Sequence, residues 1–430
     1  MQPMGVPVGC AQRLIRVSMR SGACGGLNGR VPIGVSLVLG GCLLLQVLSA
    51  AGARAQPLPP PPVTAVPAPA APSALPAAEI RGVWLTSNDM AVLRDQSRLQ
   101  ATIDQLSALN FNTLYPVVWN SGFAYYPSAV TRRRGVQSFT YLGLQGQDLL
   151  ADISARARQR GLLVIPWFEF GFMAPPSAEL VAKNPQWLTR KRDGGTTSIT
   201  AAGEVVWLNP FHPEVQAFIT ELVLEIIGNY DVDGIQFDDH MVLPSAFGYD
   251  PFTVALYRKE TKKDPPANHQ DPAWVKWRAA KITAFMARLS QAVRERKPNA
   301  IISISPNYYD HAYRLQLQDW LTWVRRRIVD EVIVQLYRPD LASFVSQLER
   351  PELAESQKLI PTAVGIMAGQ RSSPVPLERI EAQTGAARSR GIGAVFFYLE
   401  SLWRLAPEPA QVRLDGFGAL FPTPAPRRQP

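Results

Sequence analysis

Residues 213–239 read PEVQAFITELVLEIIGNYDVDGIQFDD and contain the repeating unit of this chain. Pro213–Asn229 has the apolar spacing of an amphipathic helix, and Gly234–Asp239 is a short apolar run that ends in two aspartates. A helix followed by such a run is typical of βα repeats, in which helices join parallel strands. The segment therefore predicts a parallel sheet covered by helices.

The same alternation extends from Arg81 to about Trp403. Eight runs rich in β-branched and aromatic residues are predicted strands: Gly82–Ser87, Thr113–Asn120, Leu162–Phe170, Gly234–Asp239, Ala300–Pro306, Glu331–Tyr337, Lys358–Val364 and Gly393–Glu400. Seven helical stretches fit between them, among them Arg98–Ala108, Gln147–Arg160, Pro213–Asn229, Trp274–Lys297 and Pro376–Arg390. We therefore predict an α/β fold in which eight units close into a (β/α)8 TIM barrel.

An open doubly wound sheet is the structural alternative. It would need a G-x-G-x-x-G phosphate loop after a strand, and the chain has none. Two connections are several times longer than an ordinary βα loop, namely Gly171–His212 after strand 3 and Met241–Asp271 after strand 4. Insertions on this side of a barrel build the substrate cleft. After strand 8 the chain is rich in proline, and we predict no last helix there.

The composition excludes several classes of protein. The 430 residues are 47% hydrophobic and 18% charged, a globular balance unlike that of collagen, a coiled coil or a wholly disordered chain. The formal net charge is +9, but residues 1–55 hold five arginines and no acid, which leaves 39 basic and 35 acidic residues elsewhere. This excess of basic residues is small and spread along the chain, so it does not indicate nucleic-acid binding. We therefore expect no nucleic-acid partner.

The first 55 residues are predicted to be an export signal. The apolar stretch 31–51 follows an arginine-bearing segment and precedes Ala53-Arg54-Ala55, a pattern that signal peptidase accepts. A retained membrane anchor is the alternative, because about 20 apolar residues span a bilayer. In both cases we expect a periplasmic or secreted protein. All three cysteines lie in this stretch, so the mature chain would need no disulfide.

The predicted domain order has four parts: a signal peptide (1–55), a proline- and alanine-rich linker (56–78), the barrel (79–421) and a disordered tail (422–430). Nine prolines between positions 57 and 76 favour an extended tether in the linker. Phosphate loops, nucleophile elbows and haem motifs are absent from the sequence, so we predict neither a cofactor nor a metal.

Polar residues follow the predicted strands at the ends that share one mouth of the barrel. An unpaired buried charge is very unfavourable, so acids at these ends indicate a cleft or a paired network. The predicted catalytic residues are Asp238, Glu169 and Asp239. The predicted substrate-binding residues are Trp84, Asn88, Trp119, Asn120, Trp167, Trp207, His240, Asn307, Gln335, Tyr337 and Glu400.

The two adjacent aspartates are expected to differ. Side chains alternate along a strand, so Asp238 shares a face with Gln236 and should project into the barrel mouth. Asp239 should turn sideways, toward a helix amide or an arginine. Either aspartate could instead be a helix cap or a salt-bridge partner.

Glu169 lies between Phe168 and Phe170, and desolvation by aromatic neighbours favours the protonated carboxyl group that a general acid needs. The alternative is a structural glutamate paired with Arg132, Arg133, Arg134 or Arg338. Aromatic residues near the strand ends favour a sugar ligand, because flat rings pack on pyranose faces while carboxylates and amides bind hydroxyl groups.

Three segments resemble the glycosyl-hydrolase-like 10 family of exported bacterial proteins: RGVWLTSN (Arg81–Asn88), WLNPFHPEV (Trp207–Val215) and YDVDGIQFDDH (Tyr230–His240). The resemblance extends through most of residues 79–405. It implies a TIM barrel that acts on glycosidic bonds, with peptidoglycan glycan strands as a candidate substrate.

The segment GIQFD also resembles strand 4 of α-amylase-type barrels, in which the final aspartate is the nucleophile and matches Asp238. The chain departs from that pattern at Gln236, where an arginine would stand. It also lacks a glutamate after strand 5, where SPNYYD offers only Asp310. The acid/base of amylases therefore has no counterpart here.

These observations predict glycoside hydrolysis through an oxocarbenium-like transition state. Asp238 would be the nucleophile or charge stabiliser, and Glu169 or Asp239 the proton donor. Gln335 and Tyr337 would orient the sugar.

Two alternatives belong to other functional classes. One is a metal-dependent polysaccharide deacetylase whose ligands would be Asp239, His240 and His212. The other is a catalytically inactive barrel that only binds glycan, because a fold does not establish activity.

Overall fold

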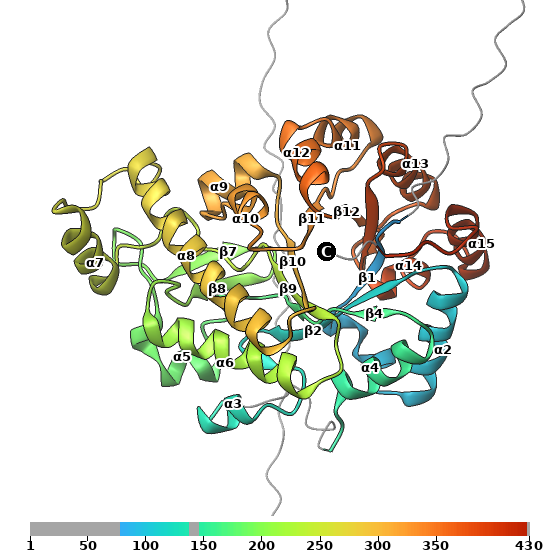
Figure 1. The fold of residues 1–430 in the computed structure, drawn as a ribbon, viewed down its shortest axis with the longest axis horizontal. Helices are drawn as coiled ribbons and strands as arrows, with labels where there is room; N and C mark the ends of the chain where they lie inside the picture. Colours follow the sequence, from blue (N-terminus) through green and yellow to red (C-terminus); the bar gives the residue numbers. More distant parts are fainter. Residues whose placement is uncertain (1–77, 137–145, 428–430) are drawn as a thin grey trace, which may run out of the picture. The chain divides into compact units, whose positions relative to one another are not determined.

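The computed structural model describes residues 78–136 and 146–427 (Figure 1). At its centre parallel strands form a closed barrel, in which β1 pairs with both β2 and β15. The barrel strands are β1 (Arg81–Leu85), β2 (Thr113–Asn120), β4 (Leu163–Val164) with β5 (Trp167–Phe168), β9 (Gly234–Asp238), β10 (Ile301–Ser305), β11 (Glu331–Gln335), β12 (Thr362–Met367) and β15 (Gly393–Phe397). With β4 and β5 as two halves of one strand, the predicted (β/α)8 fold is confirmed.

Helices surround these strands (Figure 1). The longer ones are α2 (Gln96–Ala108), α4 (Leu149–Gln159), α6 (Pro213–Asn229), α8 (Pro272–Arg296), α12 (Pro351–Leu359), α13 (Leu377–Arg388) and α15 (Ala410–Leu420). Shorter helices are η1 (Ser87–Asp89), α1 (Met90–Leu93), α3 (Ala129–Arg133), α9 (Tyr309–Gln316), α10 (Trp320–Arg325), α11 (Leu341–Leu348) and α14 (Leu399–Trp403).

The unit of α6 and β9 has the bounds that the sequence pattern indicated, apart from one residue at the end of β9. His212 caps α6, and Pro213 occupies the first turn, where its missing N–H costs no hydrogen bond. The apolar residues of α6 recur at helical spacing and are buried against the barrel, whereas every residue of β9 is buried. This packing holds the last residue of β9, Asp238, at a defined place.

Seven of the eight predicted strands have other bounds, and three of them differ most. The third strand is interrupted between β4 and β5, where Pro166 has no N–H to donate to a ladder. Lys358 belongs to α12, so β12 starts later than predicted, at Thr362. The last strand ends at Phe397, and Glu400 lies in α14.

The prediction of no helix after the last strand is wrong. Both α14 and α15 follow β15, and Phe417 of α15 packs at 5.2 Å (ring centroids) from Phe396 of β15. Proline misled the prediction because Pro409 precedes α15 as its N-cap residue, a position that does not break a helix.

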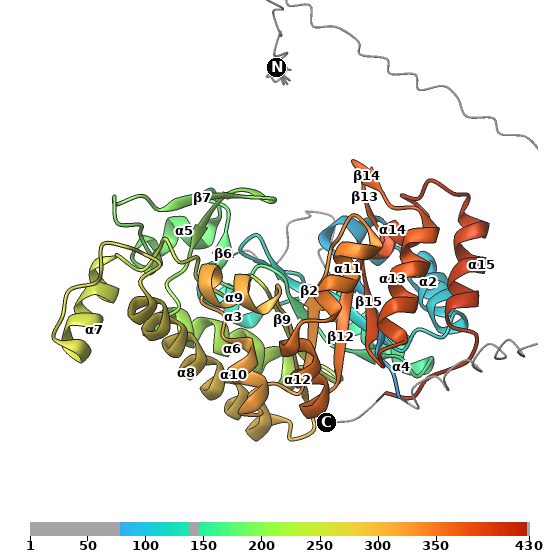
Figure 2. The same ribbon diagram turned by 90° about the horizontal axis from the view of Figure 1, so that it is seen from above.

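The two predicted insertions contain structure of their own. The first holds α5 (Glu179–Lys183), η3 (Pro185–Trp187) and an antiparallel sheet of β6 (Met173–Ala174), β7 (Thr197–Thr200) and β8 (Gly203–Trp207). The second holds α7 (Pro251–Thr261), and short hairpin strands follow β2 and β12: β3 (Phe123–Ala124), β13 (Gly369–Gln370) and β14 (Ser373–Pro374). Figure 2 shows β7 and the β13–β14 hairpin at the same end of the barrel.

Residues 422–427, predicted to belong to a disordered tail, lie against the opposite end of the barrel. The carbonyl of Thr423 accepts a hydrogen bond from Arg81, and the Arg427 guanidinium forms an ion pair with Glu331, the first residue of β11. The tail prediction is wrong for this stretch, because a buried glutamate needs a counter-charge that the sequence pattern does not reveal.

The predicted signal peptide, nearly all of the predicted linker and residues 428–430 lie outside the described residues. Within residues 78–136 and 146–427, no helix combines the length and the apolar character needed to cross a bilayer.

Candidate active site

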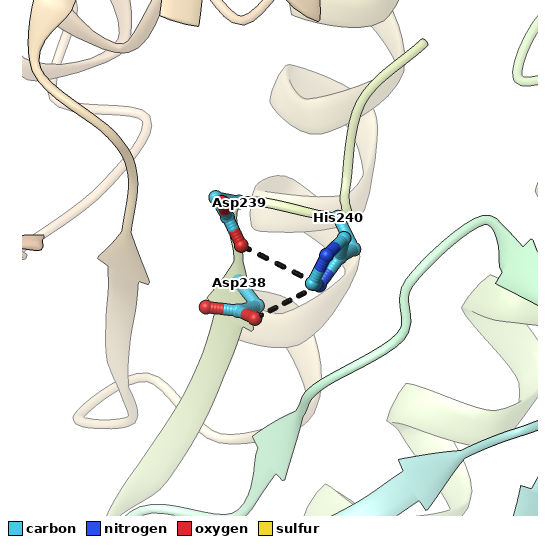
Figure 3. Close-up of side chains that lie close together, drawn as sticks. All are labelled: Asp238, Asp239 and His240. Carbon is cyan, nitrogen blue, oxygen red and sulfur yellow. Dashed lines mark hydrogen bonds and ion pairs between the residues drawn. The ribbon is translucent and has the colours of Figure 1, made fainter. Parts of the chain in front are cut away.

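Two neighbouring strands, β5 and β9, bring three carboxyl groups to the carboxyl-terminal end of the barrel. Glu169 follows β5 directly, and Asp238 and Asp239 stand at the end of β9. Figure 3 shows both aspartates facing the ring of His240. His240 Nδ1 lies 3.1 Å from Asp238 Oδ2 and 3.4 Å from Asp239 Oδ1.

Asp238 projects into the barrel mouth, as the strand alternation predicted. Ser305 and Gln335 donate hydrogen bonds to Oδ1 at 2.9 and 2.7 Å, and His240 contacts Oδ2. The side chain is only 4% exposed. Burial, followed by the nearby charge of Asp239, raises the pKa of this carboxyl group well above its ordinary range. Asp238 is thus a held, poorly hydrated carboxylate.

Asp239 does not turn toward a helix amide or an arginine. Its Oδ2 accepts a hydrogen bond from Asn307 at 2.6 Å, and its Oδ1 faces His240. The prediction was wrong because the chain has left the strand: β9 ends at Asp238, so strand alternation no longer applies to the next residue. With a side chain 14% exposed, Asp239 is more accessible than Asp238.

His240 supplies the positive charge of the group. Its Nδ1 also lies 2.9 Å from the carbonyl oxygen of Glu169, which only accepts, so Nδ1 carries a hydrogen. Burial lowers the pKa of His240, but Asp239 and Asp238 raise it more, to about 10. At neutral pH His240 is therefore an imidazolium, placed between the side chains of Asp238 and Asp239.

Glu169 has a different environment from the aspartates. Its carboxyl group accepts a hydrogen bond from Asn120, and no ion pair with an arginine forms among the described residues. Desolvation is the main cause that raises the pKa of Glu169 to about 8; the Asn120 hydrogen bond opposes this, and the charge of Asp238 adds to it. The alternative of a structural glutamate paired with Arg132, Arg133, Arg134 or Arg338 is therefore wrong.

Tyr337 and Gln335, both predicted to orient the sugar, have different environments. Burial, followed by the charges of Asp238, Asp239 and Glu169, raises the pKa of Tyr337. Gln335 Nε2 donates to Asp238 and to the carbonyl of Ser305, so this amide nitrogen orients the carboxylate and is not free for a sugar.

The sequence match covers most of the barrel. The family model described as Glycosyl hydrolase-like 10 matches residues 79–384. This chain belongs to that family. The glycosyl hydrolase DigH of Escherichia coli K12 is 25% identical over 304 residues, which cover 60% of this chain and 66% of DigH. The glycosyl hydrolase YngK of Bacillus subtilis 168 is 22% identical over 249 residues, 53% of this chain and 45% of YngK. The match thus spans just under two thirds of DigH and less than half of YngK.

Two solved structures share the fold of this glycosyl hydrolase-like 10 protein. The PgaB (BpsB) glycoside hydrolase domain of Bordetella bronchiseptica has a TM-score of 0.59 and 17% identity, over 79% of this chain and 98% of that one. α-L-Fucosidase isoenzyme 2 of Paenibacillus thiaminolyticus has a TM-score of 0.56 and 15% identity, over 80% of this chain and 48% of that one. At such identities the likeness concerns the fold alone.

Three tryptophans predicted to bind substrate are core residues in this family member. Trp84 and Trp167 fill the barrel interior at 1% and 2% exposure, and Trp84 donates to Gln236 at 2.7 Å. Trp119 faces outward and packs at 5.6 Å (ring centroids) from Phe218 of α6. The prediction was wrong for these three because barrel interiors are filled by layers of large side chains. Trp207 is buried too, but its ring lies 6.4 Å from that of His240.

The remaining predicted substrate-binding residues divide between the site and its rim. Asn307 and Asn120 bind Asp239 and Glu169 and so support the carboxyl groups. Asn88 is exposed on η1. Glu400 forms an ion pair with Arg371 at 3.0 Å, a salt bridge between α14 and the segment that joins β13 to β14.

Two supporting residues escaped the sequence analysis. Ser305, which binds Asp238, pairs with it in register between β10 and β9, so the alternation rule applied to IISIS (residues 301–305) could have found it. Gln318 donates to the carbonyl of Asp238 at 3.1 Å. It comes from the loop before α10, and no local pattern indicated it.

The metal-ligand set of the deacetylase alternative is not assembled. Oxygens of Asp238 and Asp239 and a ring nitrogen of His240 lie within 4.8 Å of one another, a grouping that could hold a cation. His212 lies elsewhere: its Nδ1 accepts from the N–H of Glu214, and its ring packs at 4.9 Å from Phe252. The third predicted ligand is instead a helix cap.

Proposed function

We propose that this protein is a glycoside hydrolase that cleaves a polysaccharide, with peptidoglycan glycan strands as the first candidate substrate. The observation that carries the proposal is the meeting of Glu169, Asp238 and Asp239 at one barrel end, in environments that separate their proton affinities. Membership of the glycosyl hydrolase-like 10 family supports it. Pairs of carboxyl groups with different proton affinities are what glycoside hydrolysis requires.

Glu169 is the proton donor in this proposal. With its pKa raised to about 8, most of the group is protonated at pH 7 and can protonate the leaving glycosidic oxygen. Asp238 and Asp239 share one imidazolium and keep a net negative charge beside it, which stabilises the positive charge that develops on the sugar. We assign that role to Asp238. Asp239 is the alternative because its side chain is more exposed.

The test is incubation of the protein with purified peptidoglycan and a panel of polysaccharides, followed by mass analysis of the products. The expected result is oligosaccharides with new reducing ends, formed by the wild type and not by the Asp238→Asn variant. No new reducing end from any glycan, together with tight glycan binding, would refute the enzyme and support the inactive glycan-binding barrel.

Two controls distinguish glycoside hydrolysis from the alternative of metal-dependent deacetylation. Dialysis against EDTA should leave hydrolysis unchanged, and no acetate should be released. Loss of activity on chelation with recovery on adding Zn²⁺ would instead assign the Asp238–His240 group to a metal.

The proposal places the protein outside the cytoplasm, as the apolar stretch 31–51 and Ala53-Arg54-Ala55 predict. Cell fractionation and mass determination of the mature amino terminus test this. A cytoplasmic protein that retains Met1 or Met19 would contradict it.

A further inference from the structure

Two arginines converge on one tyrosine beside the candidate active site. The guanidinium carbons of Arg338 and Arg350 lie 5.4 and 5.0 Å from the ring centroid of Tyr308. Tyr308 follows β10, Arg338 follows β11, and Arg350 stands between α11 and α12. Three segments distant in the sequence thus bring two positive charges within the ~10 Å over which charges interact at 0.1 M salt.

Neither guanidinium has a carboxylate within 4 Å among the residues that the structure describes. Arg338 donates to the carbonyl of Tyr337 at 3.2 Å, and Arg350 donates to the side chain of Gln347 at 2.8 Å. Arg371 is different because it pairs with Glu400. The side chains of Arg338 and Arg350 are both only partly buried, so their remaining guanidinium N–H groups are open to a bound anion.

Both arms of this cluster start one residue from the candidate active site. Tyr308 follows Asn307, whose amide donates to Asp239. Arg338 follows Tyr337 and lies three residues after Gln335, whose amide donates to Asp238 at 2.7 Å. Through Asn307 and Gln335, the segments that carry Tyr308 and Arg338 thus adjoin the side chains that bind Asp239 and Asp238. The carbonyl of Arg338 accepts from Gln383 of α13, which fixes its backbone.

The charges of the site limit what this cluster can bind. Ionised Asp238 and Asp239 repel an anion at the position of bond cleavage, so an acidic substituent needs compensating charge to one side. Guanidinium groups bind carboxylates through paired hydrogen bonds. We propose that Arg338 and Arg350 form a subsite for a carboxylate on the sugar next to the one being cleaved. This rests on the proposed glycosidase function and adds that the substrate is an acidic glycan.

The test compares matched ligands and matched variants. The ligands are peptidoglycan glycan strands with free lactyl carboxylates, C6-oxidised chitin oligosaccharides, and both after amidation of the carboxylates. Binding is measured by calorimetry in an Asp238→Asn background, so no ligand is cleaved. The variants are Arg338→Met and Arg350→Met, with Arg288→Met as control, since Arg288 on α8 donates only to the side chain of Gln216 among the contacts described.

We expect Asp238→Asn protein to bind at least one carboxylated ligand ten-fold or more tightly than its amidated form. Arg338→Met or Arg350→Met should remove that preference and leave affinity for the amidated form unchanged, and Arg288→Met should have no effect. Equal binding of both forms in each pair, or equal loss of both forms in the arginine variants, would overturn the proposal. Charge-selective binding without turnover by the Asp238-intact protein would refute the glycosidase and leave the subsite standing.

Discussion

The two ends of the barrel bury acidic residues in opposite ways. At the amino-terminal end Glu331, with a side chain only 2% exposed, pairs with Arg427 and accepts hydrogen bonds from Tyr115 and Ser303. Just before β1, Glu79 pairs with both Arg81 and Arg388. Each acid there is matched by a guanidinium, and the pair is sealed from solvent.

At the carboxyl-terminal end Asp238, Asp239 and Glu169 form no ion pair with an arginine among the described residues. Asp238 and Asp239 share one histidine, and Glu169 has an amide. Burial therefore shifts proton affinities at this end, whereas at the other end it is compensated by ion pairs. One end of the barrel thus holds paired acids that stabilise the fold, and the other holds acids with shifted proton affinities, a division that matches the usual one in TIM barrels.

Asp238→Asn should have the largest effect on activity. The amide keeps the size of the side chain and removes the charge beside the sugar, so hydrolysis should fall by at least about 10³-fold. Thermal unfolding should shift by only a few degrees, because Ser305 and Gln335 still have an oxygen to contact. Activity near that of the wild type would assign the role to Asp239, which Asp239→Asn would then test.

Glu169→Gln should lower hydrolysis of natural glycans by about 10²–10⁴-fold. The glutamine cannot donate a proton to a poor leaving group. An aryl glycoside with an acidic phenol needs no such proton, so its cleavage should be much less affected. Steady-state kinetics on both substrates measure the difference, and equal losses on both would argue against a proton donor at this position.

Glu331→Gln should destabilise the amino-terminal end of the barrel. It leaves the Arg427 guanidinium buried without a counter-ion, so the free energy of unfolding should fall by about 3 kcal/mol. The kcat of the folded protein should not change. Urea unfolding measures the loss, and Asp310→Asn, in an exposed pair on α9, is the control that should change stability by less than about 1 kcal/mol. An equal effect of both variants would refute the distinction between the ends.

The pH profile should show the smallest effect, about ten-fold per pH unit at its edges. Glu169 acts in its protonated form, so kcat/KM should fall above its raised pKa of about 8. Asp238 acts ionised, and its raised pKa moves the acid limb well above pH 4. Glu169→Gln should remove the alkaline limb. If the alkaline limb of the wild-type profile instead had its midpoint near pH 4.5, Glu169 would not be desolvated.

Parts of the site could be predicted from local sequence. Alternation along β9 placed Asp238 in the mouth, and the aromatic neighbours of Glu169 indicated a raised pKa. The same rules failed for Asp239, because they do not locate the end of a strand to within one residue. They also failed for Trp84 and Trp119, because an aromatic residue near a strand end fills the core as readily as it binds a sugar.

The sequence alone determined the barrel, since the alternation of apolar runs and amphipathic helices reflects burial that each segment needs locally. It also determined which strand ends carry acids. Only the tertiary structure decided which groups surround those acids: His240 between two aspartates, an amide beside Glu169, and Arg427 beneath Glu331. The reason is physical, because proton affinity and ion pairing depend on charges and desolvation over a few ångströms, and these come from residues up to 96 positions apart in the chain.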